Sequence, residues 1–262
     1  MKSNYWLRRD AIFHREVKIA EGEIARELSR VEAETARDVE SLYSFITSGN
    51  KNVLASDLYK YNSYFSLLEN LQNNLLTMGN KEIRTIEKSM RDLYIKNTQL
   101  IGDEIGFRIP VQEDRIIKAI KSQWLGDGKI YSDRIWGNNV VIADKVQQHL
   151  IDALIRGDSA DVLAGRLERE FEVSFRNAQR LVRTELSYIQ NQSALDGYEE
   201  AGYEYYMFKA VGDDRCCDEC MELDGNIYRI DEAIPGENIS PIHPNDRCGI
   251  LAVTEEQVKT EV

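Results

Sequence analysis

Residues 213–248, DDRCCDECMELDGNIYRIDEAIPGENISPIHPNDRC, decide how the C-terminal part of this chain can fold. Cys217 and Cys220 form a C-x-x-C pair, 22 residues separate Cys220 from His243, and Cys248 follows His243. A C-x-x-C turn presents two thiolates at one edge, and zinc needs two further nitrogen or sulfur donors to complete a tetrahedron. The intervening residues suffice for a short hairpin and a returning loop. The spacing therefore predicts a metal site that joins the two ends of this stretch.

The expected metal is structural zinc. A set of three cysteines and one histidine leaves no open coordination position for a substrate. The segment is also too small and polar to bury much apolar surface, so a metal would supply stability that a core cannot. Two other interpretations remain open: free or disulfide-bonded cysteines, with Cys216 left over, and a redox C-x-x-C pair, although no thioredoxin-like βαβ pattern surrounds it.

Short strands are expected on both sides of the cysteines. Residues 203–211, YEYYMFKAV, are aromatic and typical of a strand. Residues 226–230 and 249–256 are expected to form two further strands. Together with the cysteines and histidine they define a small β-rich unit over residues 202–262.

The net charge of −12 belongs to the C-terminal part of the chain. Residues 191–262 contain 17 acidic and five basic residues, which accounts for the whole net charge, and they also hold all four cysteines. The preceding residues are neutral overall. This unit is therefore a poor candidate for a DNA-contacting surface, because its charge would repel phosphates.

The rest of the chain is expected to be helical, from the recurrence of apolar residues at helical spacing. The expected helices cover residues 4–47, 55–78, 80–101, 112–124, 133–156, 161–171 and 174–200, with Gly79 ending the second. Gly102, Gly106 and Pro110 indicate a boundary. The predicted fold is α+β and predominantly helical: an N-terminal long-helix arm or bundle over 1–105, then a helical domain over 106–262 that ends in the zinc-binding unit.

Several functional classes are excluded by what the sequence lacks. Charges interrupt the first twenty residues, so no secretory signal is expected, and no apolar run is long enough for a membrane span. The protein is expected to fold in a reducing cytosol, which favours metal binding over disulfides. Glycine-rich phosphate-binding loops and hydrolase motifs are absent from the sequence, so no small-molecule substrate is expected.

Three arginines recur on one side of the last predicted helix, at Arg176, Arg180 and Arg183. Such a face can contact the phosphates of double-stranded DNA. Ion pairing within the protein, as between Glu172 and Arg176 at i, i+4, explains the same pattern and is favoured, because the adjoining unit is acidic.

An enzymatic interpretation is weaker. Zinc deaminases place H-x-E before P-C-x-x-C, whereas here the order is reversed and no glutamate follows His243. HNH-type nucleases combine C-x-x-C with a downstream histidine and asparagine, which His243 and Asn245 superficially fit. Ile242 stands where a second histidine would activate water. A metal-dependent nuclease acting on DNA is therefore the alternative, and no enzymatic activity is the prediction.

The order of motifs along the chain resembles that of the minor head, or head-morphogenesis, proteins of tailed bacteriophages, typified by the F protein of phage Mu. The resemblance is dense in the C-terminal half and thin in the N-terminal half, where only the opening YWLRR is similar. The matching segments are residues 5–9, 134–136, 157–159, 181–185, 213–220, 223–225 and 241–248, with Tyr198 and Gly202 between them.

This resemblance implies a structural and interaction protein of the procapsid rather than an enzyme. Such proteins associate with the portal and with capsid or scaffold proteins, are carried inside the virion, and affect head assembly, DNA packaging or DNA delivery. Some bind double-stranded DNA. The protein would be made in the cytoplasm of the bacterial host and have no membrane partner.

One position departs from the family pattern. The family commonly ends this motif H-P-N-C-R-C, and Asp246 stands here in place of the first of those cysteines. The resemblance then implies Cys248 as the fourth ligand, unless Asp246 or Cys216 takes part.

Overall fold

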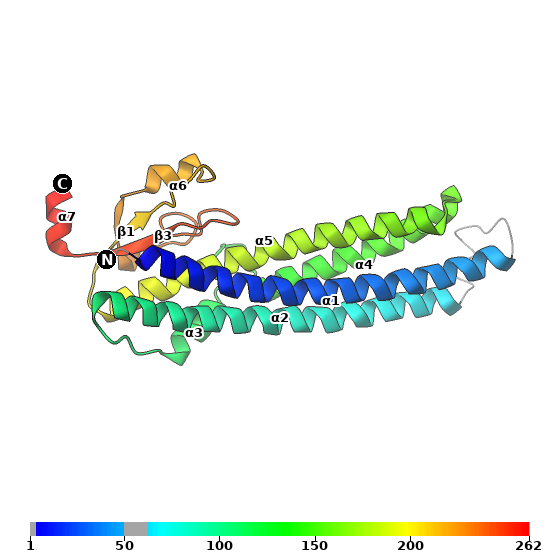
Figure 1. Cartoon of the computed structure of the whole chain (residues 1–262), viewed down its shortest axis with the longest axis horizontal. Helices are drawn as coiled ribbons and strands as arrows, with labels where there is room; N and C mark the ends of the chain where they lie inside the picture. The colour runs from blue at the N-terminus through cyan, green and yellow to red at the C-terminus, as the bar shows by residue number, and fades with distance from the viewer. Residues whose placement is uncertain (1–3, 50–61, 262) are drawn as a thin grey trace. The chain divides into compact units, whose positions relative to one another are not determined.

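The computed structural model describes residues 4–49 and 62–261. Its elements in chain order are α1 (Tyr5–Gly49), α2 (Asn62–Ile105), α3 (Glu113–Ile120), α4 (Tyr131–Arg156), α5 (Ala160–Glu200), β1 (Tyr205–Lys209), α6 (Asp218–Leu223), β2 (Ile227–Arg229), the 3-10 helix η2 (Ile230–Glu232), β3 (Gly249–Val253) and α7 (Glu255–Glu261) (Figure 1). This confirms the predicted class, predominantly helical with a small C-terminal sheet. Within the described ranges, every helix is too short or too polar to cross a membrane.

The chain divides into two compact units, each built from separate stretches of sequence. Unit 1 contains Met1–Ala20, Ile86–Tyr131 and Arg180–Val262, and unit 2 contains Glu21–Thr85 and Ser132–Gln179. Helices α1, α2 and α5 contribute residues to both. The boundary expected at residues 105–106 falls inside unit 1, at the end of α2.

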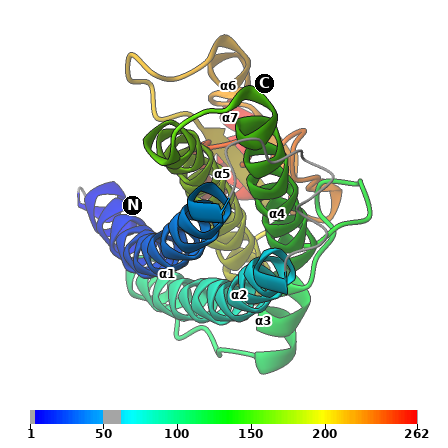
Figure 2. The same ribbon diagram turned by 90° about the vertical axis from the view of Figure 1, so that its right-hand side faces the viewer.

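Unit 2 is a bundle of segments from α1, α2, α4 and α5, which Figure 2 shows gathered together. Its core forms because apolar residues recur every three or four positions and so line one face of each helix. On α1, for example, Ile24, Leu28 and Val31 are all buried.

The prediction that Gly79 ends a helix was wrong. Residues expected to form two helices, 55–78 and 80–101, belong to the single helix α2, whose described part begins at Asn62; residues 55–61 lie outside the described residues. A Cβ at Gly79 would lie 2.5 Å from Cζ3 of Trp136 and 2.6 Å from Nδ2 of Asn139, both on α4. The glycine therefore serves close packing of α2 and α4 within unit 2, not helix termination.

The break predicted near residue 172 is also absent. The expected helices 161–171 and 174–200 form the continuous helix α5, preceded by Gly157 with φ 68° and by Ser159, whose hydroxyl accepts from the N–H of Val162. Phe171 and Ala178 are buried on either side of the expected break. Packing of these side chains keeps the helical face continuous, since most helical stability in proteins comes from such burial.

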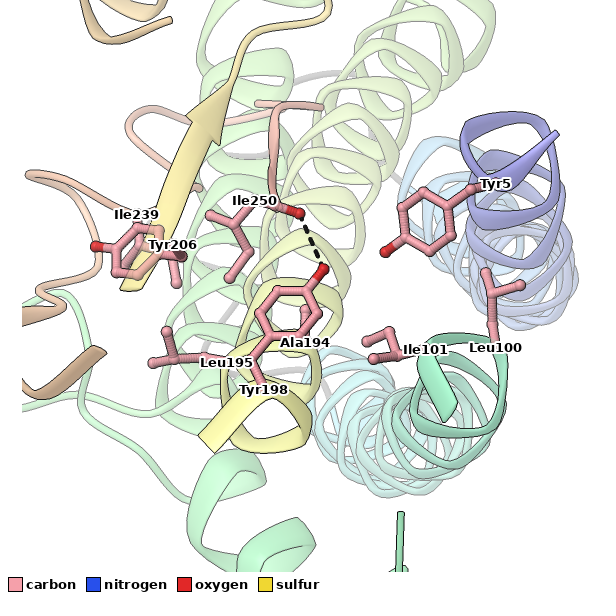
Figure 3. Close-up of a cluster of buried hydrophobic side chains, with 9 residues drawn as sticks. All are labelled: Tyr5, Leu100, Ile101, Ala194, Leu195, Tyr198, Tyr206, Ile239 and Ile250. Carbon is pink, nitrogen blue, oxygen red and sulfur yellow. Dashed lines mark hydrogen bonds between the residues drawn. The ribbon is translucent and has the colours of Figure 1, made fainter. Parts of the chain in front are cut away.

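In unit 1, an antiparallel sheet packs against helices. Strand β1 is central, with the order β2-β1-β3. A buried cluster joins β1 and β3 to α1, α2 and α5, and Figure 3 shows its side chains pointing toward one another: Tyr5, Leu100, Ile101, Ala194, Leu195, Tyr198, Tyr206, Ile239 and Ile250. Within it, the Tyr198 hydroxyl donates to the carbonyl of Ile250 at 3.3 Å. The sheet is thereby fixed against α5.

Strand β1 connects this core to the cysteines. Its residues alternate, with Tyr206 and Phe208 fully buried on one face, as the period of two in a strand requires. Tyr206 belongs to the cluster of Figure 3, whereas Phe208 packs with Cys220 and Cys248. The hydrophobic face of one strand thus places the cysteine cluster next to the main core of unit 1.

Candidate metal centre

Helix α6 presents the two sulfurs of the C-x-x-C pair at one end. Cys217 is its N-cap residue, and its Sγ accepts a hydrogen bond from the backbone N–H of Cys220 at 3.3 Å. Cys220 lies in the first turn and is buried, while Cys217 is half-buried. The capping interaction orients both sulfurs toward the same space.

The loop before β3 is shaped around Asp246. Its carboxylate is buried and accepts from the N–H of Ile242 and the N–H of Cys248, each at 2.8 Å. Asn245 adopts a left-handed conformation with φ 63°, which asparagine tolerates better than most residues. These features fold the loop back on itself and turn His243 toward α6.

The structure brings together the residues predicted to hold the metal. Donor atoms of Cys217, Cys220 and His243 all lie within 4.8 Å of one another, and so do those of Cys220, Asp246 and Cys248. Cys220 belongs to both groups, so a single region contains all four predicted ligands. These four residues can hold a metal ion.

One donor–donor distance agrees with a tetrahedral ion. Sγ of Cys220 lies 3.6 Å from Nε2 of His243. Sulfur and nitrogen at about 2.3 and 2.05 Å from a common tetrahedral zinc would themselves lie about 3.6 Å apart.

The tautomer of His243 also suits a ligand. Its Nδ1 lies 3.0 Å from the carbonyl oxygen of Pro244, which can only accept, so Nδ1 carries the proton. The lone pair then resides on Nε2, the nitrogen that faces Cys220. Metal-binding histidines are commonly oriented by a carbonyl in this way.

The buried thiols of the cluster would need a nearby cation in order to ionise. Burial raises the pKa of Cys220 well above its ordinary value, and the Asp246 carboxylate raises it further. Burial and Asp246 act in the same way on the pKa of Cys248. Without a cation these buried thiols stay protonated, whereas a divalent ion at this place would stabilise both as thiolates.

In Cys217 and His243 the neighbouring groups instead favour the charged form. Burial opposes ionisation of Cys217, but its hydrogen bonds with Cys220 and the nearby His243 lower its pKa. Burial likewise opposes the charge on His243, but the Pro244 carbonyl and the Asp246 carboxylate raise its pKa. Cys217 is therefore the thiol most readily ionised for a first bond to a metal.

Cys216 and Asp246 take different places. Cys216 is half-buried at the edge of the cluster and belongs to neither donor group of the described residues. Asp246 lies within reach of two cysteines, but each of its oxygens already accepts a backbone N–H. Asp246 therefore stabilises the conformation of the ligand loop.

Helix α5 anchors the ligand loop through polar residues that sequence reasoning missed. The N–H of Asn245 donates to Oγ1 of Thr184, and Nδ2 of Asn191 donates to the carbonyl of Cys248. Ser187 lies between them and is 3.4 Å from the Ser240 hydroxyl. The signal was the i, i+3, i+7 spacing of three small polar residues on a buried helix face.

The residues on either side of Thr184 have other positions. Arg183 is exposed. Glu185 is buried and accepts from Nε1 of Trp124 at 3.0 Å. Thr184 between them makes the contact with the loop.

Further contacts join the chain segments that carry the candidate ligands. Arg247 forms an ion pair with Asp213 at 2.7 Å, which joins the two ends of the ligand segment. Asp224 accepts from Nζ of Lys209 and from the N–H of Ala210, both at 2.8 Å. These contacts connect the turn after α6 to the end of β1.

All three arginines proposed for DNA contact are exposed on α5. Arg176 also lies 3.9 Å from Glu172, the i, i+4 ion pair considered from the sequence. Exposure is compatible with either interpretation, so DNA contact stays a prediction.

Comparison with known proteins points to the same region of the chain. An uncharacterized protein of Haemophilus influenzae is 24% identical over 206 residues, which make up 75% of this chain but only 42% of that protein. No solved structure matches the chain. Residues 144–251 match the family described as Phage Mu protein F like protein, a segment that contains all four candidate ligands. This match over residues 144–251 agrees with the resemblance to phage Mu F-like proteins that the order of sequence motifs predicted.

Proposed function

We propose that this protein is a minor head protein of a tailed bacteriophage, with a C-terminal domain closed by a structural zinc ion. The carrying observation is that the phage Mu F-like domain spans the cluster of Cys217, Cys220, His243 and Cys248. The function is structural and interactive rather than catalytic, because three thiolates and one imidazole would leave zinc without an open position.

The proposed ligands come from two separate segments. Cys217 is the N-cap residue of the six-residue helix α6 and Cys220 lies in its first turn, whereas His243 and Cys248 belong to the loop before β3. When bound, zinc supplies the bonds that cross-link these segments. Asp246 holds the loop in shape, and the Pro244 carbonyl holds the tautomer of His243.

The proposed location is the interior of the virion, and the proposed partners are the portal protein together with capsid or scaffold proteins. The support is the family resemblance, which implies association with the portal and an effect on head assembly, DNA packaging or DNA delivery. The chain spans 42% of the length of the curated relative it matches.

The experiment that tests this proposal is co-purification of the full chain with the portal protein encoded in the same phage or prophage. We expect a complex that survives size-exclusion chromatography, and we expect the protein in purified virions at low copy number. A portal that elutes separately, with the protein missing from virions, would contradict the proposal. Metal analysis of the same preparation should find about one zinc per chain.

The nuclease alternative is tested separately. A nuclease would cleave DNA with added magnesium or manganese and lose that activity in His243→Ala. We expect no cleavage, because His243 is oriented as a ligand, with Nδ1 against Pro244 and Nε2 toward Cys220. Metal-dependent cleavage that disappears in the folded variant would overturn the structural assignment.

A further inference from the structure

Arg9 is a buried cation in the first turns of α1. Only 3% of it is exposed. Its Nη2 lies 3.1 Å from the carbonyl oxygen of Cys248 and 3.4 Å from Oδ1 of Asn191, and its guanidinium lies 5.2 Å from the ring centre of Trp6. The residue thus reaches from the N-terminal helix to a candidate metal ligand that lies 239 positions along the chain.

Gly249 makes room for this contact. A Cβ at Gly249 would lie 2.9 Å from Nη2 of Arg9 and 2.9 Å from Cζ3 of Trp6. Only glycine lets α1 approach the backbone this closely. Gln190 adds a hydrogen bond to the carbonyl of Arg9, so the backbone of this turn is also held.

Among the described residues, the carboxylate that pairs with Arg9 belongs to Asp10, 3.6 Å away, and that side chain is 56% exposed. A buried guanidinium is costly without a partner that is itself shielded from water. A zinc ion with three thiolates and a neutral histidine carries a net charge of about −1.

We propose that Arg9 is a positioning residue of the metal centre, which couples metal binding to docking of the first turns of α1. The inference rests on the proposed zinc site. Arg9 fixes the carbonyl of Cys248 and offsets the charge of the loaded centre. By linkage, a metal that is bound more tightly when α1 is docked must also hold α1 more tightly when it is bound.

The coupling is tested with Arg9→Met, which removes the charge and the donors but keeps a long side chain. Arg8→Met is the matched control, because Arg8 is one residue away and pairs with the exposed Asp103. Zinc affinity is measured in the full chain by competition with a chelating dye. Amide hydrogen exchange of residues 5–20 is measured with and without zinc.

We expect Arg9→Met to weaken zinc binding about tenfold or more, as loss of a partner around the ligands commonly does, while Arg8→Met leaves it unchanged. Zinc removal should speed exchange in residues 5–20 of the unsubstituted chain. Arg9→Lys, which keeps the charge but not the planar fork, should fall between the two.

Two results would overturn the inference. One is equal zinc affinity in Arg9→Met and the unsubstituted chain, with lower stability in the variant whether or not zinc is present, which would make Arg9 merely structural. The other is exchange in residues 5–20 that does not respond to zinc. Failure of the unsubstituted chain to bind zinc is a distinct outcome, since it would reject the metal centre itself.

Discussion

The backbone N–H of Asn245 donates to Oγ1 of Thr184 at 3.0 Å, and the same hydroxyl donates to the carbonyl of Arg180 at 2.7 Å. One side chain on α5 therefore satisfies a helix carbonyl and a loop amide together. This hydroxyl attaches the ligand loop to the helix.

Thr184→Val should loosen this attachment. Valine keeps the shape of threonine but leaves the N–H of Asn245 without its acceptor, which costs about 1–3 kcal/mol of unfolding free energy. Urea unfolding of the variant measures the loss. Thr184→Ser retains the hydroxyl and serves as the control; equal stability of all three proteins would contradict the role given to this side chain.

Cys220 and Cys216 should behave differently on substitution. Cys220→Ser removes a donor shared by both three-residue groups, and we expect loss of zinc and a large drop in the melting temperature. Cys216→Ser is the matched control and should retain zinc, because Cys216 lies outside both groups. Elemental analysis and thermal unfolding of the two variants check this. Retained zinc in Cys220→Ser would reject the assigned ligand set.

The stability of unit 2 should decrease as pH rises between about 4.5 and 7, because of Glu82. Burial, together with the Glu27 carboxylate, raises the pKa of this carboxyl from 4.5 to about 7. Above pH 4.5 the unfolded chain releases the proton before the folded one does, so the contribution of Glu82 is full below that pH and is lost as pH passes 7.

Glu82→Gln tests this sign. The amide cannot ionise, so the variant should be more stable than the unsubstituted protein at pH 8, by up to about 3 kcal/mol, and similar to it at pH 4.5. Urea unfolding at the two pH values measures the difference. A stabilisation that is the same at both values would show that ionisation of Glu82 is not its cause.

Two helical glycines should respond oppositely to alanine. Gly79→Ala places a methyl group against Trp136 and Asn139, and overpacking of this kind costs about 1–3 kcal/mol. At Gly22 a Cβ meets no atom within 4 Å, so Gly22→Ala should gain about 0.5–1 kcal/mol from helix propensity. Thermal unfolding compares them. Stabilisation by both substitutions would contradict the tight contact at Gly79.

DNA binding through α5 has its own test. If the exposed arginines contact phosphates, the affinity for double-stranded DNA falls with salt, and Arg176→Ala and Arg180→Ala each weaken it and reduce the salt slope by about one. Fluorescence anisotropy over a salt series measures both quantities. An affinity that is independent of salt, or unchanged in the variants, would leave Arg176 with its ion pair to Glu172 as its role.

The apolar periodicity identified the helices, but it predicted helix ends less well. α1 and α4 match the expected ranges closely because their apolar repeat is regular and ends at loop residues. Gly79 was wrongly read as a stop because glycine serves both termination and close packing, and the sequence does not say that Trp136 lies opposite. The break predicted near residue 172 was wrong for a related reason. Burial of Phe171 and Ala178 keeps α5 helical across residues of weak helix propensity.

The sequence by itself determined the chemistry of the candidate site and the predominantly helical class. Cysteine and histidine at C-x-x-C and H-x₄-C spacing restrict the ligand types, and the alternation of β1 places Phe208 beside the cysteines. Only the tertiary structure decided which residues hold the ligand loop in position. Thr184, Asn191 and Arg9 resemble many other polar residues in sequence, and their roles follow from contacts with a loop about 57 to 239 positions away. Such contacts depend on how distant segments pack, which no local pattern encodes.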